Sequence, residues 1–516
     1  MVRVNRLLTV LVLVVLLLSA CQPIQRTPLA TTPPEPSDVI PRFVRTPCLY
    51  PTRPEDNVEC GFLLAPEVRS QPESRVIRLH VLIFKSTSDH PAPDPLVLLN
   101  GGPGSPGGPM VSGILRSDVG RVWRAERDVI YIDQRGANFS VPGLHCPALG
   151  ITAEDVAGLL YAAQDARYLA ALQDCYGVLV EKGINLSAYN VLNSAADIND
   201  LRTVLGYDQI NLYGFSYGSL LAMVVMRDYP AGIRSVILDA VWPPGVNLQC
   251  TKPACLQHAL DALFAGCAAD QACAAAYPDL EATFYAVADR LRAEPVQVVQ
   301  AFAGKGYTVT VDDLKFLNHV VYSLQMDAAN LLPAEIDAAA AGDYREVVHT
   351  WLYHATAQGT YLRKGWESPT LGLYYSVMCS YLNSCSSCPT GQNTLSDGEH
   401  AAVYHPTLVD YAGRAFNPCT FWQVAPMNQD ALLRPVRSAI PTLMLVGEFD
   451  PGLPSNLSRS AAALLSHSYY YELPVGHVSI FSPCGLSLTA AFLANPQAAP
   501  DSQCVAEMST RWVLPR

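Results

Sequence analysis

Residues 210–218 read Ile210-Asn-Leu-Tyr-Gly214-Phe-Ser216-Tyr-Gly218, and this stretch decides the fold. Its first four residues form a short apolar run typical of a buried strand, and a helix pattern follows Gly218. The Gly-x-Ser-x-Gly sequence between them occurs once in the chain. Between a strand and a helix, this motif holds the serine on a tight, strained turn whose neighbours must be small. The turn lifts the hydroxyl above the sheet at the helix N-terminus. We therefore predict that Ser216 is a nucleophile rather than part of a structural turn.

Further apolar runs predict the sheet that carries this turn. The runs at 95–99 and 128–132 are short and stop at turn residues, as buried parallel strands do. The full set lies at residues 76–84, 95–99, 128–132, 235–238, 442–446 and 469–473. A helix capped by Ser194 and ending near Gly206 leads into the strand at 210–213. The alternation predicts an α/β fold with a doubly wound, mostly parallel sheet.

A long helical block interrupts the strand pattern. Ala-rich helical stretches at 256–291 and 311–342 dominate it, and the strand rhythm stops there. An insertion of this kind is most simply a lid over the edge at which the parallel strands end. We therefore expect a core in two parts, 48–249 and 405–516, separated by a helical lid at 250–404.

A nucleophilic serine needs a base and an acid that orients the base. In this fold they follow the serine in the order acid, then histidine. Asp450 comes just after the strand at 442–446, and His477 follows the last strong strand. His467 precedes that strand and would lie at its wrong end. Glu448 and Asp239 remain as alternative acids, because Asp239 also follows a strand, the one after the serine turn.

A glycine-rich loop supplies candidate donors for an oxyanion. Asn100-Gly-Gly-Pro-Gly104 follows an apolar strand, and glycines there let backbone N–H groups approach a developing negative charge. The second donor in this arrangement is the N–H of the residue after the nucleophile, here Tyr217.

The N-terminal residues have the pattern of an export signal. Arg3 and Arg6 precede an apolar run that is too short to span a bilayer comfortably, and it ends in Leu-Ser-Ala-Cys21. This ending resembles the lipobox of bacterial lipoproteins, in which the cysteine is lipidated; the alternative is an ordinary signal peptide that happens to end in cysteine. We expect a lipoprotein signal at 1–21 and a Pro/Thr/Ser-rich tether at 22–47.

The cysteine content agrees with export. The chain has 15 cysteines, so an even number remains if Cys21 carries lipid, and disulfides are the default in an oxidising compartment. Short spacings suggest Cys48–Cys60, Cys146–Cys175, Cys267–Cys273 and Cys484–Cys504. Cys385-Ser-Ser-Cys388 has a zinc-like spacing, but without a second such pair a disulfide is favoured.

Charge and hydropathy exclude two classes of protein. The 516 residues carry a formal net charge of -12 without a clustered Lys/Arg run, which excludes a basic nucleic-acid surface. Only one long apolar run exists, so a membrane protein with several spans is excluded as well. Membrane contact is expected only through lipid at Cys21.

Three motifs in order carry a specific resemblance. They are Asn100-Gly-Gly-Pro-Gly104, Asp133-Gln-Arg-Gly136 and Gly214-Phe-Ser-Tyr-Gly218. This set resembles that of the proline iminopeptidase and tripeptidyl aminopeptidase family of α/β-hydrolases. The part from about 405 resembles the tripeptidyl-aminopeptidase-like (TAP-like) C-terminal domain.

The resemblance implies site residues and an activity. Ser216, Asp450 and His477 match the family's catalytic triad, and Gly102 matches an oxyanion-hole glycine. Members are exported or envelope serine peptidases that cleave short peptides from their N-termini, while some relatives act as esterases or amidases.

The chain departs from the family pattern at three places. Asn100 stands where iminopeptidases usually have histidine, and Asn138 stands where a second glycine is usual. Asparagine tolerates positive φ better than other non-glycine residues, so the turn at Asn138 can survive. Relatives often place an acid after the lid cysteine, but Cys379 is followed by Ser380. We interpret Arg135 as structural, holding the loop behind the oxyanion segment.

The leading prediction is an exported serine hydrolase of the aminopeptidase type that works through an acyl-enzyme, without metal or organic cofactor. Its partner is a peptide or a small ester or amide; the oligomeric state stays open. The alternatives are a carboxylesterase, lipase or amidase with the same triad, and a non-catalytic binding protein on a hydrolase scaffold. An aminopeptidase must pair the substrate ammonium with a carboxylate, since burying that charge alone costs several kcal/mol. The lid offers Asp312, Asp313, Glu335, Asp337 and Glu367.

Overall fold

The computed structural model describes residues 40–146, 151–361, 369–384, 404–414 and 417–515. The chain separates into two units, Met1–Ile40 and Pro41–Arg516, and the account below concerns the second. The predictions for the signal at 1–21, for Cys21, for the Cys385–Cys388 pair and for Glu367 lie outside the described residues.

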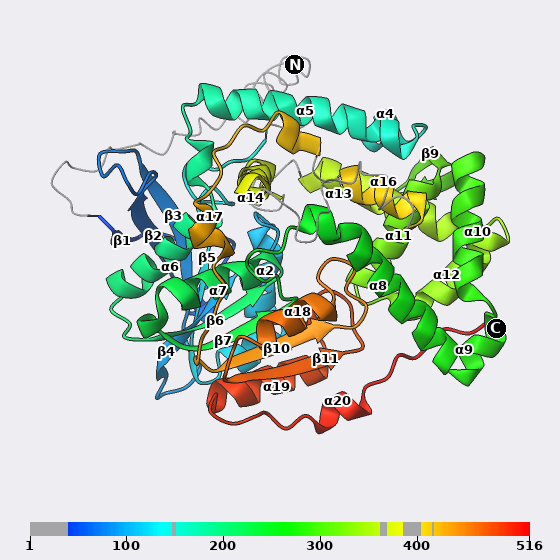
Figure 1. Cartoon of the computed structure of the whole chain (residues 1–516). Helices are drawn as coiled ribbons and strands as arrows, with labels where there is room; N and C mark the ends of the chain where they lie inside the picture. The colour runs from blue at the N-terminus through cyan, green and yellow to red at the C-terminus, as the bar shows by residue number, and fades with distance from the viewer. Residues whose placement is uncertain (1–39, 147–150, 362–368, 385–403, 415–416, 516) are drawn as a thin grey trace, which may run out of the picture. The chain divides into compact units, whose positions relative to one another are not determined.

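A nine-stranded sheet forms the centre of the second unit (Figure 1). Its order is β1-β2-β3-β5-β4-β6-β7-β10-β11, antiparallel from β1 to β5 and parallel from β5 to β11. The strands are β1 (Arg42–Arg45), β2 (Val58–Pro66), β3 (Val76–Phe84), β4 (Ala92–Leu99), β5 (Arg127–Ile132), β6 (Ile210–Phe215), β7 (Ile233–Asp239), β10 (Thr442–Gly447) and β11 (Ser468–Leu473). The predicted α/β fold is confirmed, and the structure adds β1 and β2. Strand β1 lies within the range predicted as tether, because Arg42–Arg45 pair with β2.

The C-terminal half of β4 and residues 443–446 of β10 are apolar because both faces of the sheet are buried there. Along β4, Leu96 and Leu98 belong to one core, whereas Val97 and Leu99 belong to another on the opposite face. Such double burial gives continuous apolar runs instead of alternation. Helices α6 and α7 contribute to the core of Val97, and α2, α3 and α19 contribute to that of Leu96.

The helices of the core and its C-terminal part are α2 (Gly107–Arg116), α3 (Asp118–Trp123), α4 (Ala153–Val156), α5 (Tyr161–Glu181), α6 (Val191–Val204), α7 (Tyr217–Asp228), α16 (Pro406–Arg414), α17 (Gln429–Leu433), α18 (Ser455–Ala462), α19 (Pro483–Ala494) and α20 (Gln503–Glu507). The expected cap of α6 was wrong. The helix begins one turn earlier, and the side chain of Asn190, not Ser194, accepts the capping hydrogen bond, from the backbone N–H of Asn193 at 3.0 Å.

The segment between β7 and β10 includes the part predicted to be a lid, and most of its helices pack into a second hydrophobic core, which Ala153, Val156 and Phe449 join from outside the segment. The helices of this predicted lid are α8 (Leu248–Ala269), α9 (Gln271–Ala276), α10 (Leu280–Ala293), α11 (Asp313–Gln325), α12 (Leu332–Ala340), α13 (Arg345–Tyr361) and α14 (Leu371–Ser384). The lid is not purely helical, because β8 (Val296–Phe302) and β9 (Lys305–Val311) form an antiparallel hairpin. The turn between them uses positive φ at Ala303 and Gly304.

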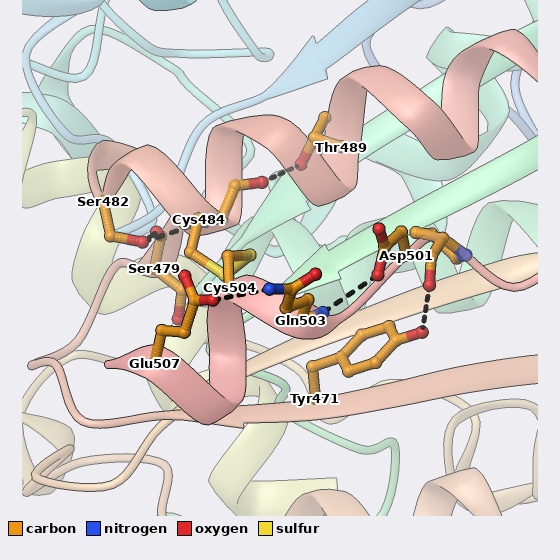
Figure 2. Close-up of a disulfide and its surroundings, with 11 residues drawn as sticks. Tyr471, Ser479, Ser482, Cys484, Thr489, Asp501, Gln503, Cys504 and Glu507 are labelled. Carbon is orange, nitrogen blue, oxygen red and sulfur yellow. Dashed lines mark hydrogen bonds between the residues drawn. A yellow bond between two sulfur atoms is a disulfide. The ribbon is translucent and has the colours of Figure 1, made fainter. Parts of the chain in front are cut away.

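Five disulfides stabilise the described part of the chain. The four pairs suggested by spacing are confirmed. The fifth, Cys379–Cys419, joins residues 40 positions apart and was not predicted. Figure 2 shows Cys484–Cys504, which ties the start of α19 to α20. Disulfides of this number are typical of proteins outside the reducing cytoplasm. None of the helices in the described ranges has the length and hydropathy needed to cross a membrane.

Candidate active site

Ser216 lies on a strained turn between β6 and α7. Its backbone has φ 55° and ψ -126°, a conformation that few non-glycine residues adopt. A Cβ at Gly214 would lie 2.2 Å from the carbonyl oxygen of Gly218, and one at Gly218 would lie 1.9 Å from that of Leu99. Both flanking residues must therefore be glycine. The N–H of Ser216 donates to the carbonyl of Asp239 at 2.9 Å, which fixes the turn to the end of β7.

Asp450 and His477 meet at the ends of the neighbouring strands β10 and β11. The Nδ1 of His477 lies 2.7 Å from Oδ2 of Asp450. The other carboxylate oxygen, Oδ1, accepts the backbone N–H groups of Gly452 at 2.8 Å and Leu453 at 3.1 Å. The carboxylate is fully buried and held in place, so it presents one oxygen to the imidazole. His467, the alternative histidine, instead contacts the hydroxyl of Tyr469 at the other end of β11.

The environment of His477 raises its pKa. Burial of the imidazole lowers the pKa, but the charge and hydrogen bond of Asp450, with a further contribution from the charge of Asp239, outweigh that effect. The imidazole therefore holds a proton more strongly than an isolated histidine does.

Asp239, the alternative acid, holds the turn that follows His477. Its carboxylate accepts the backbone N–H groups of Ser479 at 2.9 Å and Ile480 at 3.0 Å, and the hydroxyl of Tyr213 at 3.0 Å. Burial raises the pKa of Asp239 to about 6, although these hydrogen bonds act in the opposite direction. Sequence reasoning did not find this role, because its partners are 240 positions away in the chain.

The glycine-rich loop after β4 lies against the serine turn. A Cβ at Gly101 would be 3.0 Å from the Cβ of Ser216, so a side chain there would crowd Ser216. The side chain of Asn100 holds the loop by accepting the N–H of Gly101 at 3.1 Å and donating to the carbonyl of Ser105 at 3.2 Å. Gly102 has φ 104°, a conformation that favours glycine. Tyr217 is the first residue of α7, beside Ser216.

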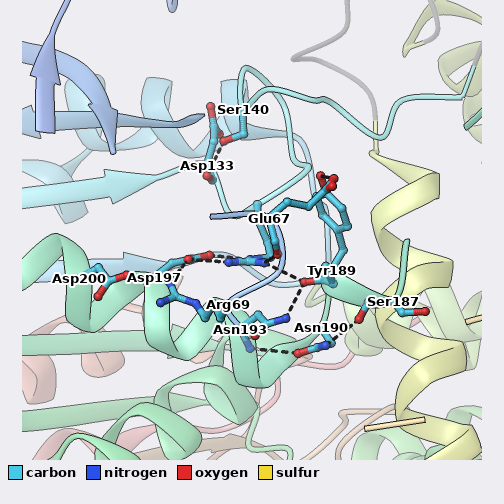
Figure 3. A network of polar contacts seen from close by, with 12 residues as sticks. Glu67, Arg69, Asp133, Ser140, Ser187, Tyr189, Asn190, Asn193, Asp197 and Asp200 are labelled. Atoms are coloured by element: carbon cyan, nitrogen blue, oxygen red, sulfur yellow. Dashed lines mark hydrogen bonds and ion pairs between the residues drawn. The ribbon is translucent and has the colours of Figure 1, made fainter. Parts of the chain in front are cut away.

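Arg135, in the loop after β5, is fully buried and makes structural contacts. Its Nε and Nη2 donate to the two carboxylate oxygens of Asp197, both at 2.7 Å, and its Nη1 donates to the carbonyls of Glu67 and Ala188. Figure 3 shows Asp197 within this network, where Arg69 also contacts it. The bidentate pair fixes the loop after β5 to helix α6.

Asn138 adopts the positive φ expected of the glycine it replaces, 43°. Its side chain makes contacts that glycine cannot make. The Nδ2 donates to Asp133 at 2.9 Å, and the Oδ1 accepts the N–H of Gly107 at the start of α2, at 3.2 Å. These contacts tie the turn at Asn138 to Asp133 and to the start of α2.

The lid contacts the site through its backbone. The carbonyl of Gln325, in the last turn of α11, accepts the N–H of His477 at 3.1 Å, and the N–H of Thr370 donates to the carbonyl of Gly104 at 2.8 Å. Nothing in the sequence pattern points to either contact, because main-chain groups carry no residue-specific signal.

The lid acids named from the sequence form contacts within the lid and its neighbours. Asp312 caps α11, Asp313 pairs with Arg292, and Glu335 contacts His319. These three carboxylates are therefore already engaged, and Asp337 is exposed to solvent.

Comparison with known families agrees with this geometry. Residues 94–266 match the alpha/beta hydrolase fold, and residues 405–504 match the TAP-like protein family. The first range contains Ser216 and the glycine-rich loop, and the second contains Asp450 and His477.

Curated relatives match parts of the chain at modest identity. The serine protease Hip1 of Mycobacterium tuberculosis is 26% identical over 224 residues, 42% of each chain. The tripeptidyl aminopeptidase of Streptomyces lividans is 27% identical over 195 residues, 36% of each chain. A proline iminopeptidase of Lactobacillus delbrueckii subsp. lactis is 38% identical over 55 residues, 10% of this chain and 19% of that protein. The matched stretches cover less than half the length of each relative. The chain therefore has the α/β-hydrolase fold, and its C-terminal part matches the TAP-like protein family.

Proposed function

We propose that the protein is a serine hydrolase of the aminopeptidase type, with Ser216, His477 and Asp450 as its catalytic triad. The observation that carries this proposal is the 2.7 Å contact between His477 and the buried Asp450; Ser216 stands on a strained strand–helix turn after β6 of the same sheet. The names of the relatives, a serine protease and a tripeptidyl aminopeptidase, favour peptides as substrates.

The reaction follows from the roles of these groups. His477 takes the proton of Ser216 as the hydroxyl attacks the scissile carbonyl, and Asp450 holds the imidazole in the required tautomer. The backbone N–H groups of Gly102 and Tyr217 stabilise the tetrahedral oxyanion. His477 then protonates the leaving amine, and water hydrolyses the acyl-enzyme by the same steps in reverse.

The test compares short peptide amides with free and acetylated N-termini. If peptides with a free N-terminus are cleaved well over tenfold faster than acetylated ones, a difference of more than about 1.4 kcal/mol, the result supports the aminopeptidase hypothesis. Equal rates would show that the ammonium is not recognised. Labelling of Ser216 by a fluorophosphonate, absent in Ser216→Ala, tests the nucleophile separately from the substrate.

An esterase or amidase is the second candidate. It is favoured by one observation: Asp312, Asp313 and Glu335 are engaged within the lid and its neighbours instead of being left for a substrate ammonium. Hydrolysis of esters together with equal rates on free and acetylated peptides would establish this second function. A chain that does not react with the fluorophosphonate would fit the third alternative, a binding protein on a hydrolase scaffold.

We further propose that the protein is exported and anchored through lipid at Cys21, with the residues between Cys21 and β1 as a tether to the folded core. The disulfides support a location outside the cytoplasm. We expect Cys21→Ser to lose lipid labelling and membrane attachment while the catalytic part keeps its activity. Unchanged attachment in that variant would contradict the lipoprotein assignment.

A further inference from the structure

An apolar cavity of about 260 Å³ lies between helix α2 and the turn after His477. None of Ser216, Asp450 and His477 lines it. Its walls are almost entirely apolar and are formed by Asn100, Ser105, Pro106, Pro109, Met110, Gly113, Ile114, Ser117, Val119, Trp123, Tyr213, Phe215, Val478, Ile480 and Phe481. Pockets that enclose a drug-sized ligand measure roughly 300–1,000 Å³, so this cavity suits a single side chain.

The cavity borders all three segments that carry the reacting groups. Asn100 and Ser105 belong to the glycine-rich loop, Phe215 immediately precedes Ser216, and Val478 immediately follows His477. Two residues of the cavity wall, Phe215 and Val478, are thus direct sequence neighbours of the proposed nucleophile and base.

The chemistry of the proposed triad indicates which part of a substrate lies next to His477. His477 gives its proton to the leaving amine, so the leaving portion of the substrate must face His477 when the bond breaks. The cavity lies against Val478, Ile480 and Phe481, on the histidine side of the site. Resting on the proposed function, we propose that this cavity is the leaving-group subsite and binds an apolar side chain of the residue just after the scissile bond.

The exposure of Phe481 supports this assignment. This residue is 71% exposed, an unusual state for a phenylalanine in a folded domain, and it forms part of the cavity wall. An exposed aromatic side chain beside an apolar cavity provides contact area for a ligand. A charged side chain would find no partner among these walls and would lose its hydration there.

Gly113 offers a way to fill the cavity without distorting the fold. It lines the cavity from α2, and a Cβ added to it would meet no atom within 4 Å. Replacement of glycine inside a helix also favours the helix. Gly113→Phe therefore places an aromatic ring where the substrate side chain would lie. Gly177→Phe on α5 is the matched control, because a Cβ there also meets open space.

The experiment uses capture of the acyl-enzyme by amines. A p-nitrophenyl ester acylates Ser216, and an amino-acid amide then competes with water. The amine nitrogen attacks the acyl carbonyl and gives its proton to His477; the bond to Ser216 Oγ breaks, and Oγ takes that proton. The products are an amide of the acyl group with the added amine and the free enzyme, and the amine occupies the leaving-group side because this step is the reverse of acylation.

We expect leucine amide and phenylalanine amide to capture the acyl-enzyme about tenfold or more better than alanine amide, relative to hydrolysis. In Gly113→Phe the preference should disappear, and in Phe481→Ala it should fall, whereas Gly177→Phe should keep it. The ratio is internal to each enzyme, so a change in the amount of active protein does not affect it.

The proposal is overturned if alanine and leucine amides capture equally well in the unmodified enzyme, or if no amine captures the acyl group. It is also overturned if Gly113→Phe and Phe481→Ala both keep the full preference. Failure of the peptidase function looks different: the enzyme would hydrolyse the ester and react with the fluorophosphonate but cleave no peptide, and the capture ratio would still report on the cavity.

Discussion

The backbone N–H of His477 donates a hydrogen bond to the carbonyl oxygen of Gln325, 3.1 Å away. The final turn of lid helix α11 is thereby fixed to the residue that we assign as the catalytic base. The preceding residue, Gly476, allows this approach, since a Cβ there would lie 2.3 Å from the carbonyl oxygen of Leu324 and 2.7 Å from that of Gln325.

We expect Gly476→Ala to reduce kcat strongly, because the added methyl forces either the lid or the His477 turn to move. The control is Gly177→Ala on helix α5, where an added Cβ would meet no atom within 4 Å. Steady-state kinetics on an ester and a peptide would measure both. Equal activity of the two variants would show that the contact is unimportant.

Removal of either reacting group should abolish turnover. We expect Ser216→Ala and His477→Ala each to remove nearly all activity, since both disable the same proton-transfer unit. Asp450→Asn should lose on the order of ten-thousand-fold in kcat, because the amide favours the wrong imidazole tautomer. Fluorophosphonate labelling and circular dichroism would separate loss of chemistry from loss of fold.

The pH dependence of kcat/KM should reflect the raised pKa of His477. The imidazole must be neutral to accept the serine proton, so activity rises with pH as His477 deprotonates. Because its pKa is raised, the midpoint of this acid limb should lie above the ordinary value of 6.5. A midpoint clearly below 6.5 would contradict the balance of burial and carboxylate charge described for this site.

Asp239 should act as a positioning residue rather than as the triad acid. Asp239→Asn places an amide N–H₂ against the N–H of Ser479 or Ile480, which should misplace the turn after His477 and lower kcat in part. Loss of the negative charge should also move the acid limb to lower pH, since that charge raises the pKa of His477. If Asp239→Asn is crippled while Asp450→Asn stays near normal, the acid assignment is wrong.

Arg135 should matter for stability and not for substrate binding. Arg135→Met leaves the buried carboxylate of Asp197 with Arg69 as a remaining partner, so we expect a loss near the lower end of about 3–5 kcal/mol. Arg121→Met breaks only an exposed pair with Asp118 and should cost about 0–1 kcal/mol. Urea denaturation would compare the two variants.

The sequence predicted the parts of the fold that have local signals. The central strands are apolar because both faces are buried, and His477 and Asp450 follow strand ends, so their contact could be expected from fold order. The β8–β9 hairpin escaped notice because β8 mixes glutamine with valine and β9 mixes threonine with valine, next to Ala-rich helices; β8 is partly exposed along its whole length.

Other features could not be derived because they depend on distant partners. The Cys379–Cys419 pair has no distinctive spacing, and several pairings of the same cysteines were equally consistent with the sequence. The role of Asp239 depends on a turn far along the chain. The main-chain contact of Gln325 with His477 is independent of side-chain type at Gln325.

The insertion of the lid between β7 and β10 has a consequence for the timing of synthesis. The ribosome completes β6 and Ser216 before residues 240–441 emerge, and β10 and β11 follow only afterwards. Strand β10 must then close a very long loop to pair with β7, and contacts of such sequence separation form late and slowly. Under the proposed assignment, a nascent or truncated chain holds a serine without its base. Hydrolytic activity would begin only when the last part of the polypeptide has joined the sheet, which delays any self-cleavage or damage to neighbouring proteins until folding is complete.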